Sequence, residues 1–258
     1  MVGRAMAATA TVVAFVFTLA LAERWLSRRR SHERAWTVSM AMFTVASGAL
    51  LWGIGVGWSA LTFRVFYLFG AILNVPWLAL GTVELLAGPR WGRPLRRWLV
   101  VASAFAAGIM LEAPLRGRVP VDQLPTGKAL FGVAPRLLAG AASGVASLVL
   151  VGGALWSAWR LWRARDRPVA ATDRARPSTA PRRLAGGNVL IAIGTLILGA
   201  SGTLNGRLGE ATAFAVTLAL GVVVLFVGFV VATSANAARR RPVAPWLDAA
   251  LAARDGAA

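Results

Sequence analysis

The chain has 258 residues, of which 57% are hydrophobic and 15% are charged, and its formal net charge is +18. A soluble domain has about 45–50% apolar and about 25% charged residues, so this composition is that of a polytopic membrane protein. The absence of cysteine and the single histidine exclude disulfides, thiolate metal sites and histidine-based triads. We therefore expect no cofactor, no metal and no enzymatic activity.

Seven apolar stretches approach the length of about 20 helical residues that a bilayer core requires. In chain order they cover residues 5–23, 36–56, 63–87, 97–113, 136–160, 186–205 and 211–235. The fourth stretch is the shortest. The sequence thus predicts an all-α bundle of seven transmembrane helices in one membrane domain, residues 1–235, followed by a basic tail, residues 236–258.

The first stretch ends in Ala20-Leu21-Ala22, which is similar to a signal-peptide cleavage site. Several arginines, from Arg24 to Arg30, follow immediately and oppose translocation, so we expect a first span with its N-terminus outside. A later segment, residues 114–135, contains Pro120, Pro125 and Gly127 and is long enough to fold over the mouth of the bundle.

The basic residues fall on alternating sides of the predicted spans. Of the 28 Lys and Arg residues, 21 lie after spans 1, 3 and 5 or in the tail. Cytoplasmic loops carry such an excess, which predicts a multi-pass protein of the cell membrane with its N-terminus outside and its C-terminus inside. The expected partners of these bases are anionic lipid headgroups at the inner face. A clustered basic face on a soluble domain is missing, so we expect no nucleic-acid partner.

A weak internal similarity links two parts of the chain. Residues 40–84 align without gaps to residues 191–235, with ten identities such as Phe63/Phe214 and Gly70/Gly221. This is about twice the number that so biased a composition gives by chance. The alignment favours a 3+1+3 parallel repeat, a plan that is found in small sugar transporters. The alternative is coincidence between membrane helices with similar glycine spacing.

The third stretch carries most of the polar residues that are candidates for a functional site. Arg64, Tyr67 and Asn74 lie close to one face at helical spacing, and Glu84 lies near the other end. Pro76 lacks a backbone N–H, which frees the carbonyl of Ile72. One interpretation is a kinked helix that lines a polar cavity or ligand site. The other is that Asn74 bonds a neighbouring helix while the charged residues anchor the helix ends.

The remaining spans argue against two known membrane functions, retinal binding and intramembrane proteolysis, and they favour close helix contact at one position. The seventh stretch has no Lys, which excludes a retinal Schiff base, and the motifs of intramembrane proteases are missing. The fifth stretch contains Gly140-xxx-Gly144 and Ser143-xxx-Ser147. Such spacing of small residues allows close helix contact, either inside the bundle or in a homodimer or with a membrane-protein partner.

Three segments carry a resemblance to a known group of proteins. They are the stretch from Tyr67 to Glu84 with Gly70-Ala71, Trp77 and Gly81-Thr82, the segment from Asn188 to Thr195, and Leu220-Gly221 with Gly228-Phe229. In these the chain resembles uncharacterised seven-helix membrane proteins of high-GC Gram-positive bacteria. The resemblance implies a seven-helix fold and no particular activity.

Two classes of function fit these observations. The first is a non-enzymatic sensor or partner-binding scaffold that uses the basic inner loops and tail. The second is a facilitator, or uniporter, for a small neutral solute, built on the possible repeat. No carboxylate is expected near the middle of the membrane, which argues against proton coupling but not against uniport.

Overall fold

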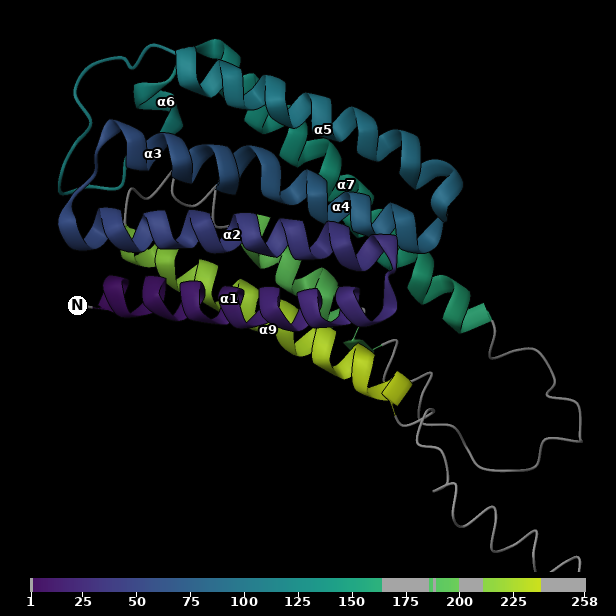
Figure 1. The fold of residues 1–258 in the computed structure, drawn as a ribbon. Helices are drawn as coiled ribbons and strands as arrows, with labels where there is room; N and C mark the ends of the chain where they lie inside the picture. The colour runs from purple at the N-terminus through teal and green to yellow at the C-terminus, as the bar shows by residue number, and fades with distance from the viewer. Residues whose placement is uncertain (1, 164–185, 188, 200–210, 238–258) are drawn as a thin grey trace, which may run out of the picture.

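The computed structural model describes residues 2–163, 186–187, 189–199 and 211–237. Within these ranges the regular secondary structure is helical (Figure 1). Six of the described helices are long and apolar enough to cross a membrane, and the apolar helix Val189–Gly199 is shorter. The predicted all-α class is confirmed, and the helix lengths are consistent with a membrane bundle. Most of the predicted tail, and residues 200–205 of the predicted sixth span, lie outside the described residues.

The helices begin and end close to the predicted limits. They are α1 (Val2–Arg28), α2 (Ser31–Val56), α3 (Ala60–Phe66), the π-helix η1 (Tyr67–Leu73), α4 (Asn74–Leu86), α5 (Pro89–Glu112), α6 (Gly127–Leu130), α7 (Val133–Arg163) and α9 (Ala211–Ala237). The largest differences are at the arginine-rich ends, where α2 begins five residues early, α5 begins eight residues early and α1 ends five residues late. Arginines that the sequence assigned to loops therefore lie in the first turns of helices.

Short turns join the first four spans and rely on unusual backbone angles. Arg29 between α1 and α2 has a φ of 53°, Gly57 after α2 has 114° and Gly88 before α5 has 77°. Glycine adopts positive φ without steric cost, whereas Arg29 does so at some cost in energy. These turns make consecutive helices antiparallel neighbours.

Small side chains allow the helices to pack closely. Ala7, Ala10 and Ala14 of α1 are fully buried, and α1 packs against α2 and α9. The composite span formed by α3, η1 and α4 lies on the other side of α2, and α4 contacts both α5 and α7 (Figure 1). The cluster of buried apolar residues extends from α1 to α9 through this centre.

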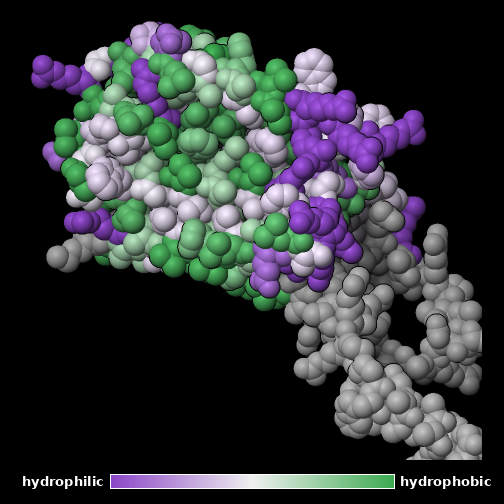
Figure 2. All heavy atoms as spheres, viewed as in Figure 1, coloured by the Kyte–Doolittle hydropathy of each residue, from purple (hydrophilic) through white to green (hydrophobic). Residues whose placement is uncertain are grey.

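Hydrophilic side chains gather at the two ends of the bundle, and apolar side chains cover the side between them (Figure 2). The arginine-rich end contains the end of α1, the start of α2, the end of α4 and the start of α5. The opposite end, here called the α6 end, contains α6 and the segment 113–132. A lateral apolar belt between polar ends is the surface expected of a helical membrane protein.

The segment 113–132 folds over the α6 end of the bundle. Phe131 is fully buried, and its ring stacks on that of Phe63 with 5.1 Å between centroids. The backbone N–H of Trp58 donates to the carbonyl of Val121 at 3.2 Å. The Thr126 side chain accepts from the N–H of Ala129 and begins α6.

Two antiparallel helix pairs cross at corresponding positions. In the first pair, a Cβ at Gly70 would lie 3.3 Å from the Cβ of Ala46 in α2. In the second pair, a Cβ at Gly221 in α9 would lie 2.7 Å from Cγ of Leu198. Subtracting the 151 residues of the sequence alignment from Gly221 and Leu198 gives positions 70 and 47. The first pair is in contact at positions 70 and 46, so the two crossings agree to within one residue.

Candidate functional site: a cavity that reaches the α6 end

A cavity of about 610 Å³ lies between α2, the composite third span, α7, α9 and the 189–199 helix, next to α6. Pockets for single small ligands have volumes of about 300–1,000 Å³. Apolar side chains form most of its wall, among them Met40, Phe43, Phe63, Phe66, Leu78 and Phe214. Its size and apolar lining are those of a ligand site.

The third span is wider where it passes the cavity. Residues Tyr67–Leu73 form a π-helix, and the N–H of Asn74 bonds to the carbonyl of Phe69, five residues earlier. The Ser143 hydroxyl of α7 donates to the carbonyl of Ala71 at 2.5 Å. The sequence led us to expect a freed carbonyl at Ile72, opposite Pro76. The Ser143 donor instead bonds to the carbonyl of Ala71, one residue before Ile72. The reason is that the π turn begins before Pro76 and shifts the hydrogen-bond register of the helix.

Asn74 lines the deep part of the cavity and is held from α2. The Ser39 hydroxyl lies 2.7 Å from Oδ1 of Asn74 and 2.9 Å from its backbone oxygen. Both residues are buried. The Nδ2 amide group has no hydrogen bond to another described residue, so its two N–H donors remain for a ligand in the cavity.

Tyr67 lines the cavity nearer the α6 end. A Cβ at Gly127 would lie 2.7 Å from the Tyr67 hydroxyl oxygen, so glycine is needed for this close contact with α6. The Tyr67 ring also packs on Phe63 and Phe131, with centroid distances of 5.8 and 5.0 Å. Its hydroxyl group makes no hydrogen bond with another described residue and lies at the cavity wall.

Lys128 and Arg136 are the charged residues among those that line the cavity, and no Asp or Glu lines it within the described part of the chain. Both ion pairs between described residues lie at the opposite, arginine-rich end. Of the hydroxyls in the wall, those of Ser47, Ser143 and Thr195 donate to helix carbonyls, which leaves their oxygens as acceptors for a ligand. The charged groups that line the described part of the cavity are both positive.

Arg64, a predicted site residue, is directed away from the cavity. Its guanidinium group donates to the carbonyls of Met110, Leu111 and Ala113 at the C-terminal end of α5, the last two at 2.7 Å. These carbonyls have no partner inside the helix and carry its negative dipole end, which a guanidinium group satisfies. Arg64 thus ties α3 to α5 in the manner of an anchoring residue.

Glu84, the fourth predicted residue, also lies outside the cavity. It is buried at the arginine-rich end, where Arg96 donates to its Oε1 at 3.1 Å. A Cβ at Gly92 would lie 2.3 Å from Cγ of Glu84, so this glycine makes room for the buried carboxylate. The structure therefore brings two of the four predicted residues, Tyr67 and Asn74, to one cavity and uses Arg64 and Glu84 to join helices.

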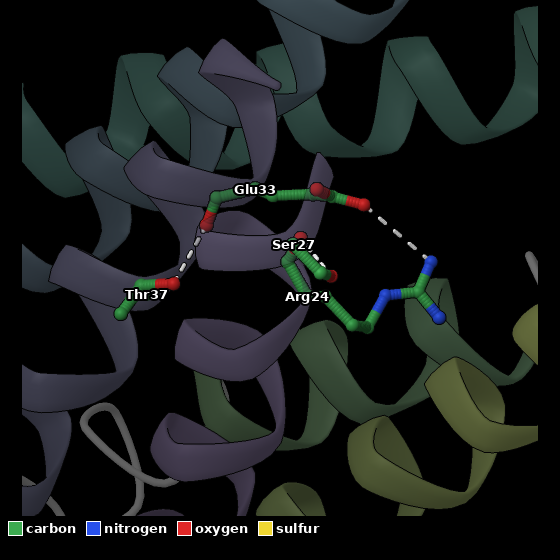
Figure 3. Close-up of polar contacts among 4 residues, drawn as sticks. All are labelled: Arg24, Ser27, Glu33 and Thr37. Carbon is green, nitrogen blue, oxygen red and sulfur yellow. Dashed lines mark hydrogen bonds and ion pairs between the residues drawn. The ribbon is translucent and has the colours of Figure 1, made fainter. Parts of the chain in front are cut away.

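A second buried carboxylate was not expected from the sequence. Glu33 in the first turn of α2 has 1% of its side chain exposed and faces Arg24 of α1, with Nη2 at 3.6 Å from Oε1 (Figure 3). Neither carboxylate oxygen has a hydrogen bond from a described residue. Arg24 also lies over the Phe229 ring of α9, 5.0 Å from its centroid, so the pair joins three helices.

The start of α2 explains why Glu33 was missed. The hydropathy pattern placed residues 24–35 in an aqueous loop, whereas the helix begins at Ser31. The signal available in the sequence was an acid in a first helical turn, where it complements the helix dipole.

The polar groups that line the cavity can bind a ligand through hydrogen bonds and charge. Its polar groups are an amide, hydroxyls and two cations, and the described residues contain no cluster of three or more His, Asp or Glu side chains that would hold a metal ion. Comparisons of the chain with protein-family models, with curated proteins and with solved structures give no match.

Proposed function

We propose that the chain is a seven-helix protein of the cell membrane, with its N-terminus outside and its C-terminus inside. The concentration of basic residues at the end that holds Arg24–Arg34 and Arg90–Arg97 supports this orientation. The cavity then opens towards the outer face, and the arginine-rich end contacts anionic headgroups of the inner leaflet.

Within this topology the protein acts as a non-enzymatic sensor, or as a scaffold whose partner contacts depend on a bound ligand. The observation that carries this proposal is that the cavity, as lined by the described residues, reaches only one end of the bundle. Its lining residues closest to the arginine-rich end are Met40 and Leu78, which lie about 14 Å and about 12 Å from the ends of their helices at 1.5 Å per residue. Beyond them the side chains of Trp36 and Glu84 fill the space against Gly81 and Gly92.

The same helices connect the cavity with the basic inner end. Asn74 and Leu78 line the cavity from α4, and Glu84 lies at the other end of that helix in its ion pair with Arg96. Met40 and Phe43 line it from α2, whose first turn carries Glu33. A ligand that shifts either helix would alter a buried ion pair, which is the type of two-state contact that transmits a signal.

Proteoliposomes and native membranes test the proposal together. The sensor is expected to leave the swelling rate of vesicles in glycerol, xylitol or glucose equal to that of protein-free vesicles. Crosslinking in native membranes is expected to capture a membrane-protein partner or a second copy on the inner loops. Solute-dependent swelling without a crosslinked partner would overturn the proposal.

A second candidate, a facilitator for a small neutral solute, is favoured by the symmetry of the cavity wall. Three pairs of lining residues are separated by the 151 residues of the repeat alignment, namely Ser47/Leu198, Phe63/Phe214 and Tyr67/Leu218. Together with the matching helix crossings, this supports the 3+1+3 repeat. In such a repeat the cavity lies between the two halves. Transporters with such repeats bind their substrates at the repeat interface.

Cavity-filling variants distinguish this candidate from vesicle leakage. Gly144 lines the cavity, and nothing lies within 4 Å of a Cβ at this position. Gly152, on the same helix and equally open, does not line it. A facilitator predicts swelling that Gly144→Leu abolishes and Gly152→Leu preserves, whereas swelling that is the same in both variants would exclude transport through the cavity.

A further inference from the structure

We infer that the cavity binds a single-chain amphiphile with an anionic headgroup, a carboxylate or a phosphate, whose apolar chain fills the cavity while the headgroup lies at Lys128 and Arg136. The inference rests on the proposed ligand-binding function and adds the chemical class of the ligand. It is carried by the charges at the α6 end, the composition of the wall and the position of the polar groups along the cavity.

The charges at the α6 end of the cavity have one sign. Lys128, the only lysine of the chain, and Arg136 line the cavity, and neither forms an ion pair with a described residue. The described acids at this end, Glu112 and Asp122, do not line it. Arg64, another cation at this end, is occupied by the carbonyls of α5. Among the described residues, two cations without an ion pair and no lining acid favour an anion over a cation or a zwitterion.

The wall below these cations is suited to a hydrocarbon chain. Phenylalanine, leucine and methionine side chains, together with several glycines, form most of it between Phe63 and Leu78, a distance of about 20 Å at the helical rise. The apolar surface favours burial of methylene groups, because it removes them from water. A sugar or another fully polar solute would lose hydrogen bonds to water there and regain few of them.

Two glycines on α7 leave room for the hydrocarbon chain of the ligand. Gly140 and Gly144 both line the cavity, and nothing lies within 4 Å of a Cβ at either position. They lie one and two turns from Arg136 along the same helix face. One helix, α7, therefore contributes both to the headgroup site and to the space for the hydrocarbon chain. Deeper in the cavity, the Asn74 amide can donate to an acceptor on the ligand.

Equilibrium binding of labelled dodecanoate and dodecyl phosphate tests the inference, with the full chain in phosphatidylcholine nanodiscs and empty nanodiscs as background. We expect saturable binding of both anions and at least tenfold weaker binding of uncharged dodecanol. Lys128→Gln and Arg136→Gln should each weaken binding of the anions about tenfold, or about 1.4 kcal/mol, without changing binding of dodecanol. Arg118→Gln is the matched control, because Arg118 is an exposed cation at the same end that does not line the cavity.

A second arm tests the cavity itself and the source of the anion. Gly144→Leu should abolish binding of dodecanoate, dodecyl phosphate and dodecanol, and Gly152→Leu should preserve it. Phosphatidylglycerol in the nanodisc should compete poorly with dodecanoate if the ligand has one chain, and strong competition would overturn that part of the inference.

These measurements distinguish a wrong headgroup assignment from a cavity that binds no ligand. Equal binding of dodecanol and dodecanoate, unaffected by Arg136→Gln but lost in Gly144→Leu, would overturn the anionic headgroup and leave a ligand-binding cavity. Binding that Gly144→Leu does not reduce would overturn both.

Discussion

Ser39 of α2 and Asn74 of α4 form a buried hydrogen bond, with 2.7 Å between the serine Oγ and the asparagine Oδ1. The sequence suggested two roles for Asn74, a bond between helices or a polar group of a cavity. The geometry combines them, because the oxygen of the amide bonds α2 while its nitrogen lies at the cavity. Fixing the oxygen also fixes the direction of the two N–H donors.

A double-mutant cycle measures this bond. Asn74→Leu and Ser39→Ala should each lower the free energy of unfolding by about 1 kcal/mol, since hydrogen bonds between membrane helices are of this size. The double variant should lose less than the sum of the two, and unfolding in mixed detergent micelles provides the values. Strictly additive losses would show that the two residues do not interact.

The Arg24–Glu33 pair predicts an asymmetric cost of removal. Arg24→Met should lower the free energy of unfolding by about 3–5 kcal/mol, because it leaves the Glu33 carboxylate buried without a counter-charge. The double variant Arg24→Met/Glu33→Met should regain most of this loss. Thermal unfolding of the purified protein checks both values, and a double variant as unstable as the single one would contradict the explanation.

Gly81 predicts a steric effect of one methyl group. A Cβ at this position would lie 2.2 Å from Cδ1 and Nε1 of Trp36, so Gly81→Ala must displace the indole ring. We expect a loss of about 1–3 kcal/mol from overpacking. Gly144→Ala, in open space within a helix, should not lower the melting temperature, because alanine favours the helix more than glycine does. Trp36→Ala combined with Gly81→Ala should recover part of the loss. A Gly81→Ala variant as stable as the parent would show that Trp36 does not lie there.

Reporter fusions test the orientation. We expect a cytoplasmic signal after Arg30, Gly92, Arg176 and Arg241 and an external signal near Gly57, Gly127 and Gly206. The positions at Arg176, Arg241 and Gly206 lie outside the described residues. An external signal at Arg176 would contradict the proposed topology, because the largest group of arginines is in that segment.

Hydropathy predicted the helices well because each span buries its backbone polar groups in its own hydrogen bonds. It predicted their ends less well. Glu33 and Arg96 are charged, which lowers the local hydropathy, yet both lie in helices and form buried or half-buried ion pairs. Pairing between spans offsets the cost of burying charge, and a one-dimensional pattern contains no information about which residues pair.

The candidate site was predicted in part for a similar reason. Tyr67 and Asn74 share one helix face, which periodicity reveals. Arg64 shares that face but finds three carbonyls at the end of α5. Lys128 and Arg136 reach the cavity from α6 and α7, and their place in the wall depends on how the segment 113–132 folds back. That fold depends on the stacking of Phe131 on Phe63, a contact across 68 positions of the chain.

The π-helix in the third span has a consequence for insertions and deletions. A π turn holds one more residue than an α turn, so removing one residue, such as Ala71, would restore a continuous α-helix. Because a π turn takes up one residue more than an α turn for about the same rotation, the parts of the span on either side of this deletion would keep their orientation. A deletion of one residue within α4, which is already α-helical, would instead rotate the two sides by about 100° relative to each other. The π-helix is therefore a place where this span can lose a residue without turning its flanking side chains out of the cavity wall.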